Sequence, residues 1–270
     1  MNKKIKKYFP LKKYSQNFLI NQKLIEEIVN FINPKVEQTL VEIGPGLGAL
    51  TKPICNIVDE LIVIEIDPVV LSCLKQFSFY SQLRVFCQDA LNFNYLNLFY
   101  NKNKLIRIFG NLPYNIATSL LFCFFKKNNI IYDMNFMLQK EVAKRLVASP
   151  GRKSYGRLSI ISQYYYNIKI IFDALSVNFR PIPKVDSAFV HFQPYKKRPY
   201  FTYNVNVLSY ITNLAFQKRR KILRHSLKSI VSEKVLLKLD IDPKLRAENV
   251  SVLQYCQLSN YIINNNILKK

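Results

Sequence analysis

Short runs of apolar residues mark the first two thirds of the chain, and several of them end at a glycine, a carboxylate or an amide. Runs of this length, bounded by polar residues, are typical of buried strands. One run is followed by a glycine-rich turn and the start of a helix, as in a sheet of parallel strands. The sequence therefore predicts an α/β fold. The expected strands are Leu40–Ile43, Leu61–Ile64, Leu83–Cys87, Leu105–Gly110, Met134–Leu138, Gln163–Leu175 and Ser187–Phe192.

Helical patterns occur near both ends of the chain. Asn21 can cap a helix that ends before Pro34. After the basic, proline-bracketed linker Pro194–Pro199 the pattern is helical up to a polar tail. We therefore expect two domains, residues 1–194 and residues 195–270. The apolar face of the first helix would hold Leu24, Ile25, Ile28, Val29 and Ile32.

A glycine-rich turn follows the first expected strand. Gly44, Gly46 and Gly48 let the backbone pass close to a ligand and adopt positive φ. The next strand ends at Glu65, about 20 residues beyond the first glycine, where dinucleotide folds hold a ribose-binding carboxylate. The spacing Gly44-x-Gly46-x-x-Ala49 also fits the NAD-binding pattern. An NAD-dependent oxidoreductase is therefore one interpretation of this half of the chain.

The tetrapeptide Asn111-Leu112-Pro113-Tyr114 is the most informative motif. It follows an expected strand, in the loop where open α/β sheets bind their ligands. The Asn111 amide oxygen and the Leu112 carbonyl, held rigid by Pro113, can accept hydrogen bonds from an exocyclic amine. Tyr114 can stack on the attached base. The alternative is a simple turn, which Asn-x-Pro sequences often begin.

The order of these features favours one class of enzyme. Asp89 follows the third strand and can accept a hydrogen bond from the amino group of a bound adenine. The glycine turn, Glu65, Asp89 and the tetrapeptide would then close four strands at one edge of one sheet. This is the layout of S-adenosylmethionine-dependent methyltransferases that act on exocyclic amines. An oxidoreductase has no use for the tetrapeptide, and no catalytic His or Tyr-Lys pair follows it.

Further segments strengthen this interpretation because they occur in a fixed order along nearly the whole chain. They are Ser15–Leu19, the turn at Gly44, Asn111–Ile116, Phe136–Val142, Tyr155–Ser159, Pro183–Ala188 and Phe216–Lys221. With them, the chain resembles the ribosomal RNA adenine N6,N6-dimethyltransferases of the KsgA/RsmA family. The resemblance implies a Rossmann-like, seven-stranded class I methyltransferase sheet in residues 1–194 and a small all-helical, RNA-binding domain in residues 195–270.

The resemblance also implies the reaction. S-adenosyl-L-methionine would be the cofactor, and the substrate would be two adjacent adenosines in the 3′-terminal hairpin loop of small-subunit (16S) rRNA, each methylated twice during subunit biogenesis. Asn17 and Leu19 would lie at the methionine end of the cofactor, and Phe179 would close the target pocket opposite Tyr114. The cofactor-binding set is then Asn17, Leu19, Gly44, Gly46, Glu65, Asp89 and Asn111. The catalytic set is Asn111, Leu112, Pro113, Tyr114 and Phe179.

The net charge of +23 suits a polyanionic partner. Part of this charge reflects a chain rich in Lys, Asn and Ile, as expected from a genome biased towards AT, so charge alone does not predict RNA binding. Residues 1–13 form a basic arm that could face the RNA. The other residues expected to contact RNA are Arg145, Arg152, Lys153, Arg157, Lys218, Arg219, Arg220, Lys221 and Arg224.

The cysteines form no Cys-x-x-Cys pair and are expected to be reduced, as in a cytoplasmic protein. His191 and His225 are far apart and lack ligand-type neighbours, so no metal site is expected. Neither a signal peptide nor a membrane span is expected. We expect a monomer whose partner is rRNA within the immature small subunit.

Two other functions stay open at this point. One is the related activity that methylates a single adenine of large-subunit (23S) rRNA and confers macrolide resistance. The other is a largely non-catalytic role in ribosome assembly. The context Lys184-Val185-Asp186-Ser187 favours the small-subunit enzyme over the first, and the intact Glu65, Asp89 and Asn111 favour catalysis over the second.

Overall fold

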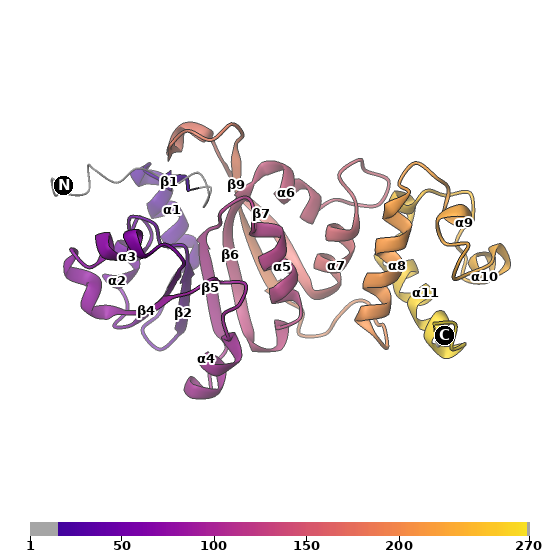
Figure 1. The fold of residues 1–270 in the computed structure, drawn as a ribbon, viewed down its shortest axis with the longest axis horizontal. Coiled ribbons are helices and arrows are strands. Elements are labelled where there is room, and N and C mark those ends of the chain that lie inside the picture. Colours follow the sequence, from indigo (N-terminus) through magenta and orange to yellow (C-terminus); the bar gives the residue numbers. More distant parts are fainter. Residues whose placement is uncertain (1–15, 269–270) are drawn as a thin grey trace. The chain divides into compact units, whose positions relative to one another are not determined.

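A seven-stranded sheet organises the first part of the computed structural model, which describes residues 16–268 (Figure 1). Its strand order is β4-β3-β2-β5-β6-β9-β7. Strands β2 to β6 pair in parallel, and β9 runs antiparallel to β6. The predicted α/β fold and its seven-stranded sheet are confirmed. The strands are β2 (Thr39–Ile43), β3 (Leu61–Glu65), β4 (Leu83–Cys87), β5 (Ile106–Asn111), β6 (Ile131–Gln139), β7 (Tyr166–Ala174) and β9 (Ser187–Pro194).

One predicted strand began too early. Residues 163–165 were expected in the strand that leads to Leu175, but they form the end of helix α7 (Arg157–Tyr165), and β7 starts at Tyr166. Tyr164 and Tyr165 favour strands by their side chains alone. Here both rings are buried, with their centroids 5.0 Å apart, so tertiary packing overrides that preference.

Helices cover both faces of the sheet. On one face, α1 (Gln22–Ile32), α2 (Thr51–Cys55) and α3 (Pro68–Leu74) bury their apolar side chains against β2 and β3. As predicted, the Asn21 side chain caps α1 by accepting the Leu24 N–H. On the other face, α5 (Ala117–Phe125) contributes Phe124, whose ring stacks on Phe136 of β6 at 6.0 Å. Because both faces are covered, the strands are apolar runs rather than alternating ones. Helix α4 is Tyr95–Lys102.

A second, two-stranded sheet joins segments that are far apart in sequence. Strands β1 (Phe18–Leu19) and β8 (Phe179–Arg180) pair antiparallel, with Leu19 opposite Phe179. The Ile20 N–H also donates to the Asn178 carbonyl at 2.9 Å. The N-terminal segment is therefore fixed to the chain that enters β9.

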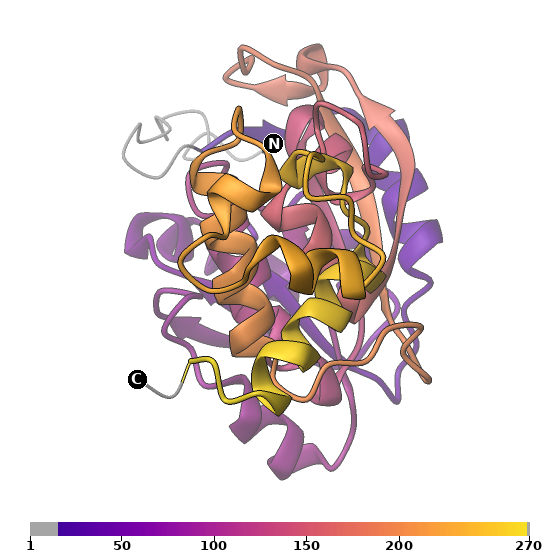
Figure 2. The same ribbon diagram turned by 90° about the vertical axis from the view of Figure 1, so that its right-hand side faces the viewer.

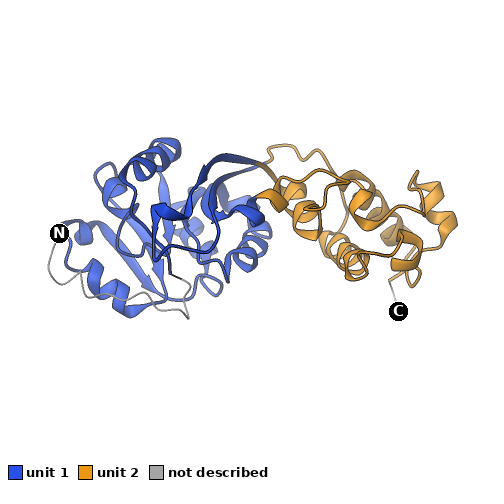
Figure 3. Ribbon diagram, turned by 90° about the horizontal axis from the view of Figure 1, so that it is seen from above, with its two compact units in different colours: residues 1–143, 169–194 blue, residues 144–168, 195–270 orange. Residues whose placement is uncertain are grey.

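The chain divides into two compact units, one of residues up to 143 together with 169–194 and one of residues 144–168 together with 195–270 (Figure 3). The expected division at residue 194 placed residues 144–168 with the first domain, whereas in the structure they cluster with the second unit. The reason is helix α7, which packs against α8 (Val205–Gln217) and α11 (Val252–Asn264). The basic arm of residues 1–13 lies outside the described residues.

Helices make up the second unit. Helices α8 and α11 lie side by side (Figures 1 and 2), with Leu208 and Leu258 fully buried. The Ser251 hydroxyl caps α11 by accepting the Gln254 N–H at 3.2 Å. The unit also contains the short helices α9 (Leu223–Ser226) and α10 (Glu233–Lys238), and α6 (Lys140–Leu146) crosses the boundary between the two units.

Strands β2 and β5 approach each other too closely for a side chain at one point. A Cβ atom at Gly110 of β5 would lie 2.3 Å from the Ile43 carbonyl oxygen of β2. This clash involves backbone on both sides, so no side chain can move to relieve it. Gly110 therefore permits the pairing of β2 with β5. The glycine turn follows β2, and the tetrapeptide loop follows β5.

Replacing this glycine should be costly. We expect Gly110→Ala to lower the free energy of unfolding by at least roughly 3 kcal/mol, the upper end for overpacked sites. The control is Gly151→Ala, where φ is also positive (+83°) but no atom lies within 4 Å of the added Cβ. That change should cost only about 1 kcal/mol. Urea unfolding of both variants measures the difference, and equal losses would show that backbone conformation, not the strand contact, determines the cost.

Candidate active site

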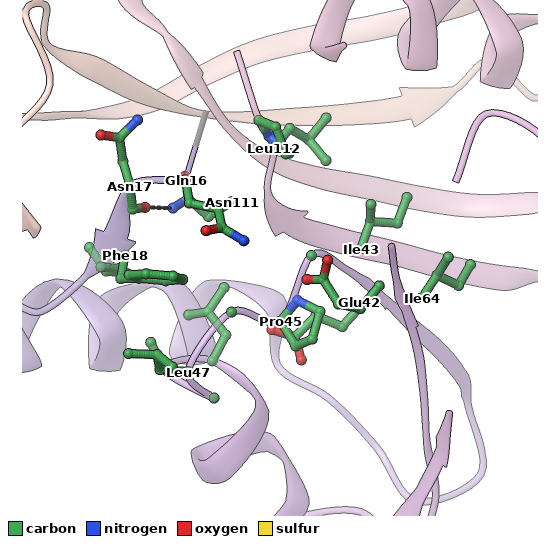
Figure 4. Close-up of a pocket in the computed structure, with 18 of the residues that line it drawn as sticks. Gln16, Asn17, Phe18, Glu42, Ile43, Pro45, Leu47, Ile64, Asn111 and Leu112 are labelled. Atoms are coloured by element: carbon green, nitrogen blue, oxygen red, sulfur yellow. Dashed lines mark hydrogen bonds between the residues drawn. The ribbon is translucent and has the colours of Figure 1, made fainter. Parts of the chain in front are cut away.

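A cavity of about 1060 Å³ lies at the carboxyl ends of the parallel strands (Figure 4). The strand order places the loops after β4, β3, β2 and β5 side by side there. Every predicted site residue of the first unit except Phe179 lines this cavity. They are Asn17, Leu19, Gly44, Gly46, Glu65, Asp89, Asn111, Leu112, Pro113 and Tyr114.

The glycine turn after β2 is shaped by contact with the N-terminal segment. Gly46 has φ of +56°, which favours glycine, and a Cβ there would lie 2.7 Å from the Phe18 ring. The Phe18 ring thus occupies the space that any other residue at position 46 would need. The glycines of the turn line the cavity together with Pro45 and Leu47, and the missing side chains let a ligand approach the backbone at the glycines (Figure 4).

Two buried carboxyl groups line the cavity beside this turn. Glu42, in β2, is 1% exposed and accepts a hydrogen bond from the Thr51 hydroxyl at 2.7 Å. Burial raises the pKa of Glu42 to about 8, although the Thr51 hydrogen bond acts in the opposite direction. Glu65 ends β3 and accepts the Asp67 N–H at 2.8 Å. Burial raises its pKa to about 7.

Asp89 is the third carboxylate of the cavity and is half-buried. Its Oδ1 accepts the Leu91 N–H at 2.9 Å, which fixes the side chain at the end of β4. Glu65 and Asp89 thus follow neighbouring parallel strands, because Glu65 pairs with Cys87 in the register of β3 and β4. Hydroxyl and amino donors of a ligand would find acceptors on both.

The segment Gln16–Ile20, which we call the strap, borders the cavity and is held at several points. The Gln16 amide donates to Asp67 Oδ2 at 3.0 Å, next to the loop that carries Glu65. The Asn17 carbonyl accepts from Asn111 Nδ2 at 2.6 Å (Figure 4). The strap therefore connects the acidic side of the cavity to the tetrapeptide.

The hydrogen bond from Asn111 to Asn17 decides which end of the amide faces the ligand. A carbonyl can only accept, so the NH₂ group of Asn111 must point to Asn17 and the amide oxygen is turned the other way. The next residue, Leu112, is buried, and its N–H donates to the Met137 carbonyl at 3.3 Å. The tetrapeptide thus presents oxygen acceptors whose orientation is set by backbone contacts.

Tyr114 ends the tetrapeptide as a half-buried ring on the cavity wall. Its hydroxyl forms a 2.7 Å hydrogen bond with the Ser187 hydroxyl of β9. Burial raises the pKa of Tyr114. The ring is therefore neutral and anchored at its far end, as an aromatic surface for stacking requires.

Phe179 does not reach the cavity. Its ring is fully buried in the core with Leu19 and Phe189. Strand alternation explains this position, because Phe179 and its exposed neighbour Arg180 point to opposite sides of β8. In this structure Phe179 supports the strap through Leu19 and offers no surface to a ligand.

The basic residues predicted to contact RNA lie in the second unit, and they differ in their surroundings. Arg219 pairs with Glu248 at 2.8 Å and also donates to the Lys153 carbonyl. Arg224 pairs with Glu233 at 3.2 Å, and Arg157 donates to the Ser209 hydroxyl at 3.0 Å. Arg145 is half-buried. The exposed members of the set are Arg152, Lys153, Lys218, Arg219, Arg220 and Lys221.

Sequence reasoning gave no role to Glu42 and Asp67, and it named Gln16 and Ser187 only within the segments Ser15–Leu19 and Pro183–Ala188. Glu42 carried a signal, since a carboxylate inside an apolar strand is rarely buried without a task. The individual contacts of Gln16, Asp67 and Ser187 could not be predicted, because they join segments distant in sequence. Among the described residues, no cluster of His, Cys, Asp and Glu is arranged to hold a metal ion, and no helix is long and apolar enough to span a membrane.

Comparisons with known proteins agree with this geometry. The family model described as ribosomal RNA adenine dimethylase matches residues 11–264. The ribosomal RNA small subunit methyltransferase A of Buchnera aphidicola subsp. Schizaphis graminum is 77% identical over 269 residues, covering 100% of this chain and 98% of that protein.

Solved structures show the same fold at lower identity. A dimethyladenosine transferase from Plasmodium falciparum superposes with a TM-score of 0.76 at 22% identity, covering 93% of this chain and 98% of that chain. The 23S rRNA methyltransferase ErmE gives a TM-score of 0.69 at 20% identity, covering 92% of this chain and 100% of that chain. At these identities the likeness concerns the fold alone.

The buried Glu42 should make stability depend on pH. The folded chain keeps the Glu42 proton up to about pH 8, whereas the unfolded chain releases it near the ordinary pKa of 4.5. Folding is therefore favoured less and less as the pH rises from 4.5 to 8. Gln at this position cannot ionise but can still accept from Thr51, so Glu42→Gln should gain stability relative to the wild type with increasing pH.

Thermal unfolding at pH 5 and pH 8.5 tests this expectation. The variant should unfold at least roughly 2 °C higher than the wild type at pH 8.5, the shift that about 1 kcal/mol gives in a domain of this size. The two proteins should differ less at pH 5. A difference in unfolding temperature that is the same at both pH values would mean that Glu42 is ionised in the folded chain.

Proposed function

The chain belongs to the ribosomal RNA adenine dimethylase family, and we propose that it dimethylates N6 of two adjacent adenosines in the 3′-terminal hairpin loop of small-subunit (16S) rRNA, using S-adenosylmethionine. One observation carries this proposal: the tetrapeptide from Asn111 to Tyr114 lines the same cavity as Glu65 and Asp89. Acceptors for an exocyclic amine thus stand next to acceptors for a nucleoside. Relatives of high identity carry the name of a small-subunit rRNA methyltransferase.

The cavity fits the cofactor by the chemistry of its walls. The glycine turn lines the cavity with Gly44, Gly46 and Gly48, and the Phe18 ring packs on Gly46 at one side, so a ligand would lie between the turn and the strap. Glu65 would accept from the ribose hydroxyls and Asp89 from the adenine amino group. Glu42 also lines the cavity, and its carboxylate would add negative charge near a cationic ligand when it ionises. Bound S-adenosylmethionine supplies a methyl group attached to a positively charged sulfur.

Asn111 and Leu112 would prepare the nucleophile. In free adenine the N6 lone pair is delocalised into the ring, and the amine is a poor nucleophile. In the first transfer the Asn111 amide oxygen and the Leu112 carbonyl would accept from the two amine hydrogens and favour a tetrahedral nitrogen. The lone pair then points away from both acceptors towards the methyl donor. In the second transfer one hydrogen remains for one of these acceptors, and each transfer releases one proton from the nitrogen to water. Positioning and electrostatics of this kind account for the acceleration without a covalent intermediate.

Tyr114 would hold the target base. An adenine must leave its stack to enter the cavity, and stacking on an aromatic ring offsets part of that cost. The hydrogen bond to Ser187 fixes the ring before the base arrives. Phe179 would face the base only if its ring left the core, so we assign it the support of Leu19 in the strap instead.

The cavity can bind an adenine but cannot choose among the many adenines of a ribosome, so selection must come from a wider surface. A phosphate contact does not specify a base, but several spaced contacts position the protein on one folded RNA. We propose that the exposed basic residues of the second unit supply these contacts, on a folded, immature small subunit in the cytoplasm, with the enzyme acting as a monomer. Three of the predicted arginines, Arg157, Arg219 and Arg224, already bind side chains of their own unit. We assign them mainly to stabilising that unit. The strongest candidates for phosphate contacts are Arg152, Lys153, Lys218, Arg220 and Lys221.

The large-subunit activity is the nearest rival. Its likeness to this chain rests on the fold of ErmE at 20% identity, whereas the small-subunit relatives reach 77%. A non-catalytic assembly role is less well supported, because the carboxylates and the oriented amide of a working site are all in place.

Methyl transfer from labelled cofactor to under-methylated small subunits and, in parallel, to protein-free large-subunit rRNA tests the function. We expect label in the 3′-terminal hairpin, where primer extension should stop at two adjacent adenosines. Asn111→Ala should lose at least roughly 100-fold in turnover, a typical loss for one oriented catalytic hydrogen-bonding group, while RNA affinity is unchanged. Label in large-subunit rRNA would favour the rival enzyme, and near-normal turnover of Asn111→Ala would remove the role of its amide.

A second prediction concerns the basic cluster at the end of α8. Lys218, Arg220 and Lys221 are exposed, and none forms an ion pair with another described residue. Changing all three to Gln should reduce the slope of log K against log salt for rRNA binding by roughly 0.7–0.9 per lost phosphate contact. Cofactor affinity should stay the same. An unchanged salt slope would mean that these side chains face only water.

A further inference from the structure

The segment between β9 and α8 presents two large aromatic rings to water. Phe201 and Tyr203 are 63% and 60% exposed, and both belong to the second unit. Rings of this size are usually buried, because each exposes apolar area that water solvates poorly. Two of them side by side on one short segment therefore suggest a binding surface.

The segment is held rigidly against α11. Asn260 binds it twice, by donating to the Phe201 carbonyl at 3.0 Å and by accepting the Tyr203 N–H at 2.9 Å. Between the two rings, Thr202 points inwards, is buried, and donates to the Ser259 hydroxyl at 2.9 Å. Alternation along an extended segment thus turns Thr202 to the core and both rings outwards. Their exposure is fixed by these contacts.

The two rings also fix each other. Their centroids lie 5.0 Å apart with the planes at 81°, an edge-to-face arrangement. In this arrangement the edge of one ring meets the face of the other, so the pair keeps outward faces to which a further flat ring can stack. A pre-ordered aromatic face costs little conformational entropy when a ligand binds.

Positive charge lies immediately before the rings. Lys196 and Lys197 are exposed, whereas Arg198 lies over the rings of Tyr164 and Tyr165 at 5.2 and 5.1 Å. Arg198 thereby anchors the segment at its start. Lys196 and Lys197 thus precede the rings by a few residues along the chain. Cations for the phosphates together with rings for the bases are the combination that binds unpaired nucleic acid.

We propose that Phe201 and Tyr203 form a stacking platform for unpaired bases of the RNA substrate, with Lys196 and Lys197 on the adjoining phosphates. The platform is separate from the target cavity, since it lies wholly on the second unit and does not line that cavity. The proposal rests on the proposed function only in taking rRNA as the ligand.

The chain contains no tryptophan, which allows a direct optical test. Phe201→Trp keeps a stacking ring and introduces a single tryptophan, which can be excited at wavelengths where tyrosine hardly absorbs. A short single-stranded oligoadenylate should quench its fluorescence in a saturable way, and the same sequence in a duplex should quench it much less. The matched control is Tyr100→Trp, on helix α4 of the first unit, where the replaced ring is 71% exposed and no change is expected. Equal responses of the two reporters would overturn the proposal.

A second experiment measures the contribution to binding. The double change Phe201→Ser and Tyr203→Ser should weaken the affinity for under-methylated small subunits about tenfold, or about 1.4 kcal/mol, within the range for one stacked base. The KM for the particle should rise while kcat and cofactor affinity stay the same. Unchanged affinity and KM in a protein that still methylates would reject the platform and leave the proposed function intact.

Binding of RNA to the tryptophan reporter distinguishes failure of the platform from failure of the proposed function. If the wild type fails to methylate but the tryptophan reporter still responds to oligoadenylate, the proposed function fails and the platform stands. If the reporter responds to the whole particle and never to protein-free RNA, the surface binds a ribosomal protein, which contradicts the proposal. Circular dichroism of the double variant shows whether the second unit keeps its helices, and the two single reporters do not depend on that result.

Discussion

The parallel pairing of β2 with β5 sets the positions of the groups on which the proposed chemistry depends. These two central strands bring the glycine turn and the tetrapeptide to the same edge of the sheet, and a bare Gly110 against the Ile43 carbonyl lets them approach closely. β3 and β4 then add Glu65 and Asp89 at that edge. In an in-line transfer the methyl carbon lies between the donor sulfur and the accepting nitrogen, so both ligands must be held in line at close range, and loops from adjacent parallel strands place their binding groups side by side.

Burial gives the site its electrostatic character. Glu42 and Glu65 are removed from water, and within residues 16–268 neither forms an ion pair, so burial raises the pKa of both and favours their neutral forms. A cationic ligand would favour the ionised forms in their place, so its binding and the release of protons would be coupled. A neutral product would lose that advantage. The same acids would therefore favour the charged cofactor over the uncharged molecule it leaves behind.

Local patterns in the sequence were enough to predict the strands of the sheet and most of the residues that line the cavity. Apolar runs located the strands, and the residues that ended them located the site, because parallel strands share one carboxyl edge. The wrong boundary of β7 came where distant contacts decide, because residues 163–165 join a helix that packs on α8 and α11. Distant contacts also set the surroundings of two predicted site residues: Phe179 is buried and its strand pairs with Leu19, and Arg219 is paired with Glu248. The two-residue strands β1 and β8 are too short for any periodic signal.

The contact between the strap and Asn111 uses the Asn17 carbonyl, an atom that every amino acid possesses. Substitution at position 17 therefore leaves the acceptor in place. Insertion or deletion of one residue between 16 and 20 would instead reverse the direction of each carbonyl, turn Leu19 out of the core and break the pairing with β8. Position 17 should thus tolerate substitution, whereas the strap as a whole should not tolerate a change in length. In a lineage with strongly biased codon usage, a backbone acceptor would keep the orientation of the Asn111 amide while the side chain at position 17 changes.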